Sequence, residues 1–325
     1  MSERRSDVEL SVIVPVGKRQ ADPAALHREY KTSLDALGQS YEIIFVLDGP
    51  RHNYAAGLRQ LLTQGEQFTI VSLAREFGEA TALMAGFENA SGETIVTLPA
   101  YHQIDASEIA KLVEVAESNE VGIGWRWPRA GGPLERIRRG AFHGLLRWVT
   151  KLDYHDLGCG ARAFNRRVLD EIQLYGDQHR FLPVLADRQG FKVREVAVTQ
   201  STKDRFADRY SVRDYLRGLL DIFTIFFLTR FTKKPLRFFG VVGAAIFLVS
   251  ALAVVWLVVE RLIFHQALAE RPALLLVSLL MVLGLQLFAL GLLGELIIFT
   301  HSRTIKDYQI DRVIRFGPER KSSND

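Results

Sequence analysis

Two long apolar runs near the end of the chain dominate its pattern of hydrophobic and polar positions. Residues 238–259 carry no charge and one clearly polar residue, Ser250, while residues 273–294 contain one serine and one glutamine as their polar side chains. Each run is long enough for a helix to cross a hydrocarbon core of about 30 Å. Neither run shows the polar stripe of a helix that packs on a soluble core. The pattern predicts a transmembrane hairpin with spans at 238–259 and 273–296.

The charges that flank these runs predict their orientation. Four basic residues lie within 230–237, before the first run, and two lie within 303–306, after the second. The link 260–271 is balanced, with two acidic and two basic residues. Because basic flanks stay on the cytoplasmic side, we expect both termini in the cytoplasm and the link outside. The single cysteine, Cys159, fits a domain in a reducing compartment.

The part of the chain before the hairpin alternates between two hydrophobic periods. Short β-branched runs predict strands, and apolar residues at helical spacing predict helices between them. The expected strands are 10–16, 41–47, 68–73 and 93–98, and the expected helices are 23–37, 58–62, 79–89 and 106–118. This order predicts an α/β fold with a doubly wound, mostly parallel sheet. Ligands bind beyond the carboxyl ends of such strands, so the loops 17–20, 48–52 and 99–103 are the candidate site.

Composition limits the partners that this architecture can have. With 325 residues and a net charge of +4, the chain has room for one cytosolic domain of about 200 residues and the hairpin. The basic residues gather beside the predicted spans, where anionic lipid attracts them. We therefore expect a membrane partner and no nucleic acid.

Several motifs follow one another in an order that resembles a known family. They are SVIVPV, EIIFVLDGP, LAREFGEATALMAGFENASGETIVTL, HDLGCGARAFNRRVLDEI, RFADRYSVRDYLRGLLDIF and LQLFALGLLGELI. Their order and spacing resemble family 2 glycosyltransferases of GT-A fold, and within them the polyprenyl-phosphate branch. The similarity runs over residues 10–310 and implies a membrane protein of the bacterial inner membrane.

The resemblance implies a division of the chain into four parts. Residues 1–200 would form the cytosolic GT-A domain, 201–237 juxtamembrane and interfacial helices, 238–300 the hairpin and 301–325 a cytosolic tail. Apolar residues at helical spacing in 212–231 agree with a helix that lies in the membrane interface. The resemblance also implies a homo-oligomer assembled through the hairpin.

The resemblance implies transfer of a sugar from a nucleotide sugar to a polyprenyl phosphate. The residues that it places near the acceptor and the sugar, our candidate catalytic pair, are Asp156 and Arg162. The candidates for binding the nucleotide sugar are Pro15, Val16, Lys18, Arg19, Asp48, Arg75 and Gln103. The candidates for binding the lipid phosphate are Arg205, Arg209, Tyr210 and Ser211. Two alternatives stay open: a structural ion pair between Asp156 and Arg162, and general attraction of the cations to anionic lipid.

The chain departs from the family at the positions that hold a divalent metal. The family's Asp-Ala-Asp-x-Gln loop, which binds Mg²⁺ or Mn²⁺, falls on residues 99–103 and reads Pro-Ala-Tyr-His-Gln. Both carboxylates are absent, and these metals need hard oxygen ligands. The family's paired aspartates read Leu47 and Asp48, and its Tyr-Asn-Glu reads Gly-Lys-Arg at 17–19. We therefore predict no conventional metal site and no confident cofactor, with His102 as a solvated loop residue.

Three accounts of the activity follow from these substitutions. In the first, the protein is a transferase in which Lys18, Arg19 or Arg75 replaces the metal by neutralising the diphosphate. In the second, it is an inactive relative that binds a lipid phosphate, a nucleotide or a partner protein. In the third, the hairpin serves translocation and the soluble domain regulates it.

Four further residues stand out in the sequence. Trp125 and Trp127 alternate along a predicted strand, which places both rings on one face and favours core packing over a sugar-stacking platform. Cys159 is expected to be a small buried residue. Glu295 lies near the end of the second span, where the family's Gly-Glu pair favours a structural role over a functional intramembrane carboxylate.

Overall fold

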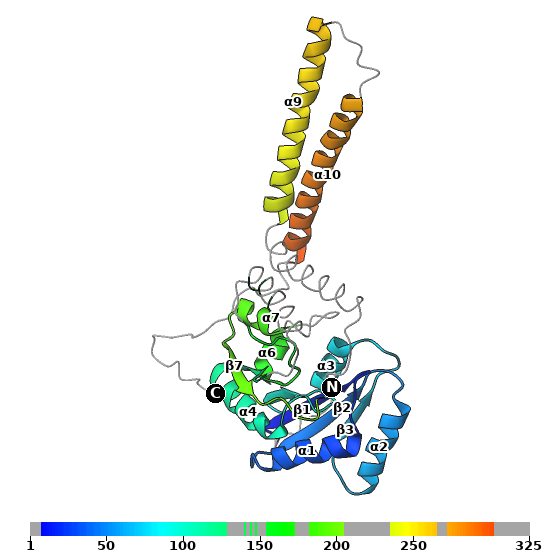
Figure 1. The fold of residues 1–325 in the computed structure, drawn as a ribbon, viewed down its shortest axis with the longest axis vertical. Coiled ribbons are helices and arrows are strands. Elements are labelled where there is room, and N and C mark those ends of the chain that lie inside the picture. Colours follow the sequence, from blue (N-terminus) through cyan, green and yellow to red (C-terminus); the bar gives the residue numbers. More distant parts are fainter. Residues whose placement is uncertain are drawn as a thin grey trace, which may run out of the picture. The chain divides into compact units, whose positions relative to one another are not determined.

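The computed structural model describes residues 8–128, 140, 144, 147, 154–172, 182–204, 235–264 and 272–301. These residues fall into two compact units, one drawn from residues 8–204 and one from residues 235–301 (Figure 1). The first unit is an α/β domain, and the second is a pair of long helices.

The α/β domain is built on a seven-stranded sheet. Its strands are β1 (Leu10–Val16), β2 (Tyr41–Leu47), β3 (Thr69–Ser72), β4 (Thr94–Thr97), β5 (Val121–Arg126), β6 (Arg162–Asn165) and β7 (Val193–Val198). Its helices are α1 (Pro23–Asp35), α2 (His52–Thr63), α3 (Glu79–Glu88), the 3₁₀ turn η1 (Ala106–Glu108), α4 (Ile109–Asn119), α6 (Arg166–Glu171) and α7 (Leu182–Gln189). The first four strands lie within one residue of their predicted bounds, whereas α2 begins six residues before the predicted 58–62.

The strand order is β3-β2-β1-β4-β6-β5-β7. β1 pairs in parallel with β2 and β4, β2 with β3, and β5 with β7. The exception is β6, which runs antiparallel to both of its neighbours, β4 and β5. The predicted mostly parallel sheet is therefore confirmed, with one antiparallel strand inside it.

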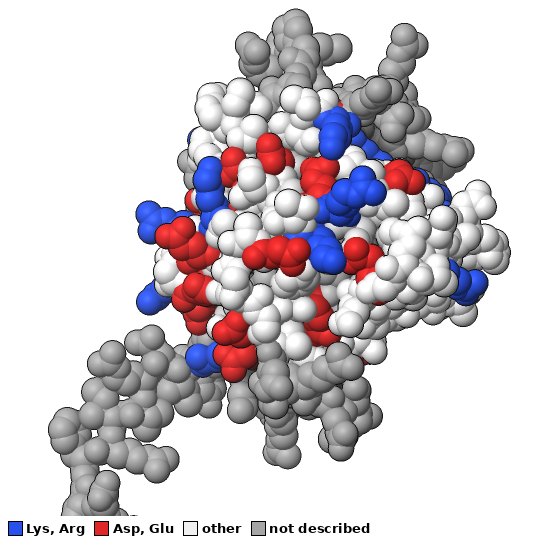
Figure 2. Space-filling model, turned by 90° about the horizontal axis from the view of Figure 1, so that it is seen from below, with Lys and Arg blue, Asp and Glu red and all other residues white. Residues whose placement is uncertain are grey.

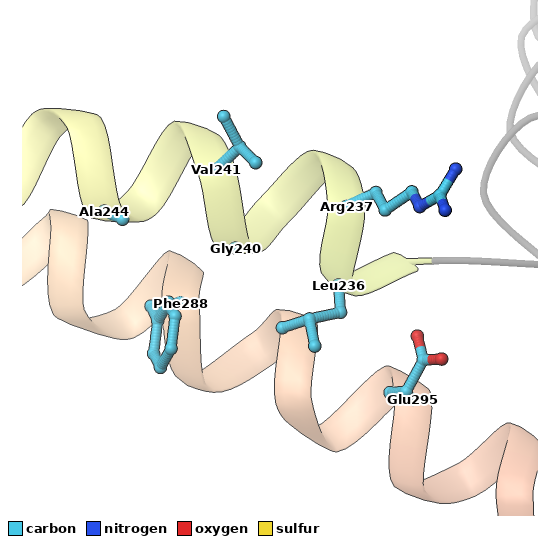
Figure 3. A pocket seen from close by; sticks show the side chains of 7 residues that line it. All are labelled: Leu236, Arg237, Gly240, Val241, Ala244, Phe288 and Glu295. Carbon is cyan, nitrogen blue, oxygen red and sulfur yellow. The ribbon is translucent and has the colours of Figure 1, made fainter.

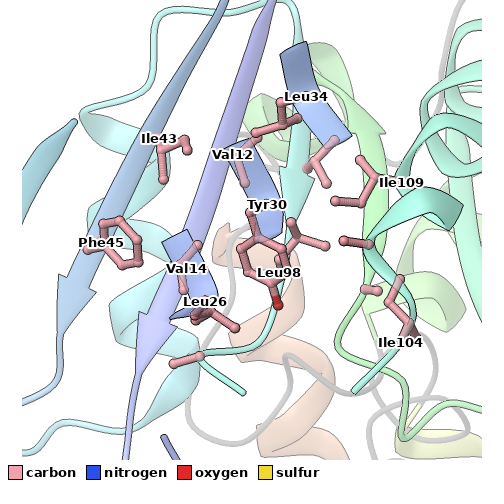
Figure 4. Close-up of a cluster of buried hydrophobic side chains, with 14 of the residues drawn as sticks. Val12, Val14, Leu26, Tyr30, Leu34, Ile43, Phe45, Leu98, Ile104 and Ile109 are labelled. Carbon is pink, nitrogen blue, oxygen red and sulfur yellow. The ribbon is translucent and has the colours of Figure 1, made fainter. Parts of the chain in front are cut away.

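Both faces of the sheet are covered, which explains why β1 and β2 read as mostly apolar runs. On one face, Val12, Val14 and Phe45 pack with side chains of α1, α2 and α4, as Figure 4 shows for Leu26 and Tyr30. On the other face, alternate residues of the same strands pack with α3, α6 and α7. The seven residues of β1 are all buried, as a strand between two helical layers should be. This arrangement leaves the carboxyl ends of β1, β2 and β4 as the place where polar loops gather.

The second unit contains the two predicted spans. A π-helical turn, η3 (Leu236–Gly240), leads into α9 (Val241–Phe264), and α10 (Pro272–His301) follows the link. The segments Leu236–Glu260 and Pro272–Ile298 are 25 and 27 residues long and are apolar enough to cross a membrane. Most of their large apolar side chains are exposed rather than packed in a core. Such a surface suits lipid contact on the outside of a membrane hairpin.

Glycines bring the backbones of α9 and α10 into direct contact. A Cβ atom on Gly243 would lie 2.6 Å from the carbonyl oxygen of Gly284, and one on Gly284 would lie 2.6 Å from the backbone nitrogen of Phe247. A residue with a Cβ atom at either position would collide with the backbone of the other helix. Membrane helices use small residues in this way, because close approach maximises van der Waals packing where no hydrophobic effect drives association.

Candidate active site

Asp48, which follows β2, holds the loop between β3 and α3 in place through hydrogen bonds. One oxygen of its carboxylate accepts a hydrogen bond from the backbone nitrogen of Phe77 at 2.7 Å, and the other accepts one from Gly78 at 3.2 Å. The side chain is buried, and the backbone nitrogen of Asp48 donates to the carbonyl oxygen of Val16 at 3.1 Å. Asp48 therefore ties the ends of β1 and β2 to the start of α3. Pro15, one residue before Val16, is also buried within β1.

Basic side chains gather around Glu76 beside this loop. Glu76 accepts a hydrogen bond from Arg51 at 2.8 Å and lies 3.6 Å from the ammonium group of Lys18. Arg75 lies over the ring of Phe77, 4.8 Å from its centroid. Lys18 is 84% exposed, so most of its ammonium group faces solvent. Three basic side chains thus lie around one carboxylate near the carboxyl ends of β1 and β2.

Arg19 is fixed by two partners at the end of β1. Its guanidinium carbon lies 3.8 Å from the centroid of the Tyr101 ring, which is cation–π geometry. It also forms an ion pair with Asp204, whose side chain is completely buried. Asp204 accepts a further hydrogen bond from the Gln200 amide at 2.7 Å. Arg19 itself stays 43% exposed, so it is both held and accessible.

Asp204 also connects Arg19 to a second, buried ion pair. The Arg126 guanidinium lies 3.8 Å from Asp204 and donates to both carboxylate oxygens of Asp156, at 2.6 and 3.0 Å. Burial works against the charge on Arg126, but the hydrogen-bonded carboxylate of Asp156 outweighs it and raises the arginine pKa. Arg19, Asp204, Arg126 and Asp156 form an alternating row of charges, which we call the charge chain.

The second candidate catalytic residue, Arg162, braces the loop before β6. It is buried and donates to the carbonyl oxygens of Cys159 at 2.9 Å and of Leu157 at 2.8 Å. Cys159 is buried as well, which confirms that prediction, and burial raises its pKa to about 11. Arg162 and Asp156 thus both act on the segment between β5 and β6, one from the strand and one from the loop.

Gln103 and Tyr101 interlock in the loop after β4. The Gln103 amide nitrogen donates to the Tyr101 hydroxyl at 2.8 Å, and its amide oxygen accepts from the backbone of Gly160 at 2.7 Å. Burial raises the pKa of Tyr101 to about 12, with Arg19 opposing the rise, so the phenol is neutral at physiological pH. Gln103 therefore links this loop to the loop before β6.

The loop 99–103 reads Pro-Ala-Tyr-His-Gln, so its sequence contains no carboxylate. Its oxygen donor at the second carboxylate position is the neutral Tyr101 hydroxyl, which already accepts a hydrogen bond, while Arg19 covers the ring. The neighbouring carboxylates of Asp156 and Asp204 are held by guanidinium groups. Within the described ranges, three or more His, Cys, Asp or Glu residues do not come together as a metal-binding group.

Two predictions about this region are wrong. His102 is not solvated: its side chain is 11% exposed, and its Nδ1 atom lies 2.9 Å from Glu29, which also pairs with Lys203 at 2.8 Å. Trp127 does not pack in the core, because it is 62% exposed. Its ring centroid lies 5.6 Å from that of Trp125, which stacks on His155 at 4.3 Å. The contact of His102 with Glu29 joins the loop after β4 to α1, and a local sequence pattern does not show such a contact.

The charges on one face of this unit are mixed. Figure 2 shows acidic and basic side chains interspersed there rather than gathered into a patch of one sign. The lipid-phosphate candidates Arg205, Arg209, Tyr210 and Ser211, and the interfacial stretch 212–231, lie outside the described residues.

The hairpin has a pocket of its own near the start of η3. It has a volume of about 620 Å³ and is lined by Leu236, Arg237, Gly240, Val241, Ala244, Phe288 and Glu295 (Figure 3). Glu295 places one buried carboxylate oxygen there, and none of the described residues donates a hydrogen bond to it. The end of α10 thus carries a half-buried acid on the side that faces η3.

Known proteins resemble this chain over most of its length. The family model described as Glycosyl transferase family 2 matches residues 11–173. A dodecaprenyl-phosphate galacturonate synthase from Rhizobium johnstonii is 27% identical over 302 residues, which cover 91% of this chain and 89% of the relative. An undecaprenyl-phosphate 4-deoxy-4-formamido-L-arabinose transferase from Yersinia enterocolitica is 30% identical over 329 residues, which cover 100% and 98%.

A solved structure supports the fold. Glucosyl-3-phosphoglycerate synthase from Mycobacterium tuberculosis superposes with a TM-score of 0.50 at 14% identity, over 69% of this chain and 80% of that one. The sheet order and the loops at its carboxyl edge thus define a GT-A-like α/β domain, which a pair of long apolar helices follows. The chain belongs to glycosyltransferase family 2, in the polyprenyl-phosphate branch.

Proposed function

We propose that this protein transfers a sugar from a nucleotide sugar to a polyprenyl phosphate at the cytoplasmic face of a bacterial inner membrane. The observation that carries the proposal is the set of accessible cations, Lys18 and Arg19, at the carboxyl end of β1. In an open α/β sheet this is the edge where a nucleotide binds. Similarity to the Yersinia enterocolitica transferase over the whole chain supports the choice of a polyprenyl-phosphate acceptor.

The proposal includes the arrangement in the membrane. The two apolar helices anchor the protein, and the basic flanks of the hairpin put both termini in the cytoplasm. A cytoplasmic catalytic domain would meet the nucleotide sugar in solution and the phosphate of the lipid at the membrane surface. Copies of the protein assemble through their hairpins.

The proposal also includes transfer without a conventional Asp-x-Asp metal site. Its support is the composition of the loop 99–103, where proline and tyrosine replace the two carboxylates. The charge on the diphosphate must then be offset by side chains, because buried or partly buried anions need a nearby positive charge.

A second candidate function is binding without transfer. It is favoured by the carboxylates described at these loops, which already have partners: Asp48 accepts from two backbone nitrogens, while Asp156 and Asp204 pair with arginines. A protein of this kind would use the same edge to hold a nucleotide or a lipid phosphate.

Transfer can be tested on the full-length protein in detergent micelles. Undecaprenyl phosphate is incubated with a panel of UDP-, GDP- and CDP-sugars, with Mg²⁺ or Mn²⁺ and with a chelator, and glycolipid is detected by mass spectrometry. A lipid-linked sugar formed from at least one donor supports the transferase. Binding of a nucleotide or of the lipid, with no product from any donor under either condition, supports the second function instead.

A further inference from the structure

Arg19 lies on a residue of the loop that the resemblance aligns with the family's metal-binding motif. By that resemblance Tyr101 corresponds to the second aspartate of the motif, and the Arg19 guanidinium lies 3.8 Å from the centre of its ring. The Tyr101 ring thus supports the permanently charged guanidinium of Arg19. Arginine keeps its charge at any physiological pH.

The contacts of Arg19 leave part of its guanidinium open. One face lies on Tyr101 and one nitrogen pairs with Asp204, yet the side chain is 43% exposed. Because two partners fix the group, a ligand that binds it does not have to order a flexible side chain. The remaining N–H groups are available for charge-assisted hydrogen bonds to phosphate oxygens.

The carboxylates of the charge chain do not fully cancel the positive charge of Arg19. Asp204 accepts from Arg19 and Gln200 and lies 3.8 Å from Arg126, so its single negative charge is shared between two guanidinium groups. Asp156 pairs with Arg126 from the other side. Lys18, the preceding residue, adds a second accessible charge. The end of β1 therefore offers one cation in a fixed position, Arg19, and beside it the exposed Lys18, which lies 3.6 Å from Glu76.

We propose that Arg19, seated on Tyr101 and positioned by Asp204, neutralises the diphosphate of the nucleotide in place of a divalent metal. This inference rests on the proposed nucleotide-sugar chemistry. In the transfer, an oxygen of the lipid phosphate bonds to the anomeric carbon as the bond from that carbon to the diphosphate oxygen breaks. The electron pair leaves with the nucleoside diphosphate, and Arg19 offsets the negative charge that this group gains. The lipid phosphate attacks as an anion, so the step requires no proton transfer.

The test measures binding of UDP and GDP to the full-length protein by calorimetry in the presence of EDTA. The wild type is expected to bind at least one of them in the chelator, and added Mn²⁺ should change the affinity by less than about twofold. Arg19→Gln should weaken binding about 10- to 100-fold, the range expected for one lost hydrogen bond to a charged group. Arg19→Lys, which keeps the charge but not the fork, should fall between the two. Arg28→Gln, an exposed arginine on α1, is the matched control and should bind as the wild type does.

A second variant separates binding from folding. Arg19→Gln leaves Asp204 buried with one charged partner fewer, so loss of binding could reflect a disturbed fold. The double variant Arg19→Gln with Asp204→Asn removes both charges of the pair. It should melt within about 2 °C of the wild type, as a change of less than about 1 kcal/mol in a domain of this size implies, and still bind weakly.

Each outcome has a separate meaning. Binding in chelator that depends on Arg19 supports the inference. Binding that EDTA abolishes and Mn²⁺ restores overturns it, together with the proposed absence of a metal site, but leaves sugar transfer to the lipid phosphate intact. Binding in chelator that Arg19→Gln does not weaken also overturns it. Absence of nucleotide binding and of glycolipid under both conditions overturns the inference and the proposed function together.

Discussion

Replacing Asp156 with asparagine removes the negative charge from a buried ion pair. Both side chains of the pair are 2% exposed, and Arg126 donates to both carboxylate oxygens at 2.6 and 3.0 Å. Asparagine keeps the shape of the side chain but offers one acceptor oxygen where aspartate offers two. Arg126 is then left with a buried charge that the isosteric amide cannot balance.

The size of the effect follows from this geometry. Breaking a buried ion pair by removing one partner costs about 3–5 kcal/mol. The lower end applies here, because Arg126 retains Asp204 at 3.8 Å as a second carboxylate. A loss of about 3 kcal/mol lowers the melting temperature of a domain of this size by about 6–12 °C.

Thermal unfolding of the purified full-length protein, followed by tryptophan fluorescence, measures the shift. Glu114→Gln on the exposed face of α4 is the control and should melt as the wild type does. The double variant Arg126→Met with Asp156→Leu should recover most of the loss, because it leaves neither charge unpaired. A shift below about 2 °C for Asp156→Asn would refute the reasoning, and so would a double variant less stable than the single one.

Three other properties can be checked in the same way. His27 is buried, and burial lowers its pKa. As the pH drops below 6.5, the unfolded chain therefore binds a proton at His27 that the folded chain does not, and the melting temperature should fall. The fall should be smaller in the variant His27→Gln. Gly243→Leu should force α9 and α10 apart and cost about 1–3 kcal/mol or more in thermal unfolding, whereas Val255→Leu on the exposed side should be neutral. The variant His265→Cys should react with an impermeant maleimide in intact cells, because the predicted orientation places the link 260–271 outside. The wild type should not react, since its single cysteine, Cys159, is buried. Protection of the new cysteine would contradict the predicted orientation.

The parts of the fold that the sequence predicts are those fixed by local burial. β1 and the last five residues of β2 are buried, so both strands read as mostly apolar runs and their bounds can be read to within a residue. The hairpin is predicted for a similar reason, since a span has to be apolar over its full length. β6 is different, because its four residues, Arg162–Asn165, form a strand only through pairing with β4 and β5.

The residues of the candidate site were likewise predicted from the sequence only in part. Arg19 is predicted as a ligand-binding residue because it follows β1, and every open α/β sheet places such loops at its binding edge. Its partner Asp204 is 185 residues away in the chain and lies in a polar segment that reads as a surface turn. The sequence pattern does not single out Arg126 either, because the alternating Trp125 and Trp127 on each side of it are the prominent feature of that strand. Pairings made across such distances depend on the whole sheet, so the charge chain could not be read from spacing.

The place of β6 in the sheet has a consequence for synthesis on the ribosome. β6 is the neighbour of β4 in the finished order, yet roughly 65 residues of chain separate the end of β4 from the start of β6, which take about 3–13 s to translate. During that interval the strands β3, β2, β1 and β4 can already pair, because each partner has been made. The outer edge of β4 meanwhile presents its backbone N–H and C=O groups without a partner, as an edge strand does when nothing covers it. A nascent chain paused before residue 162 should therefore be the species most prone to strand-mediated association, and a binding site for chaperones that recognise such edges.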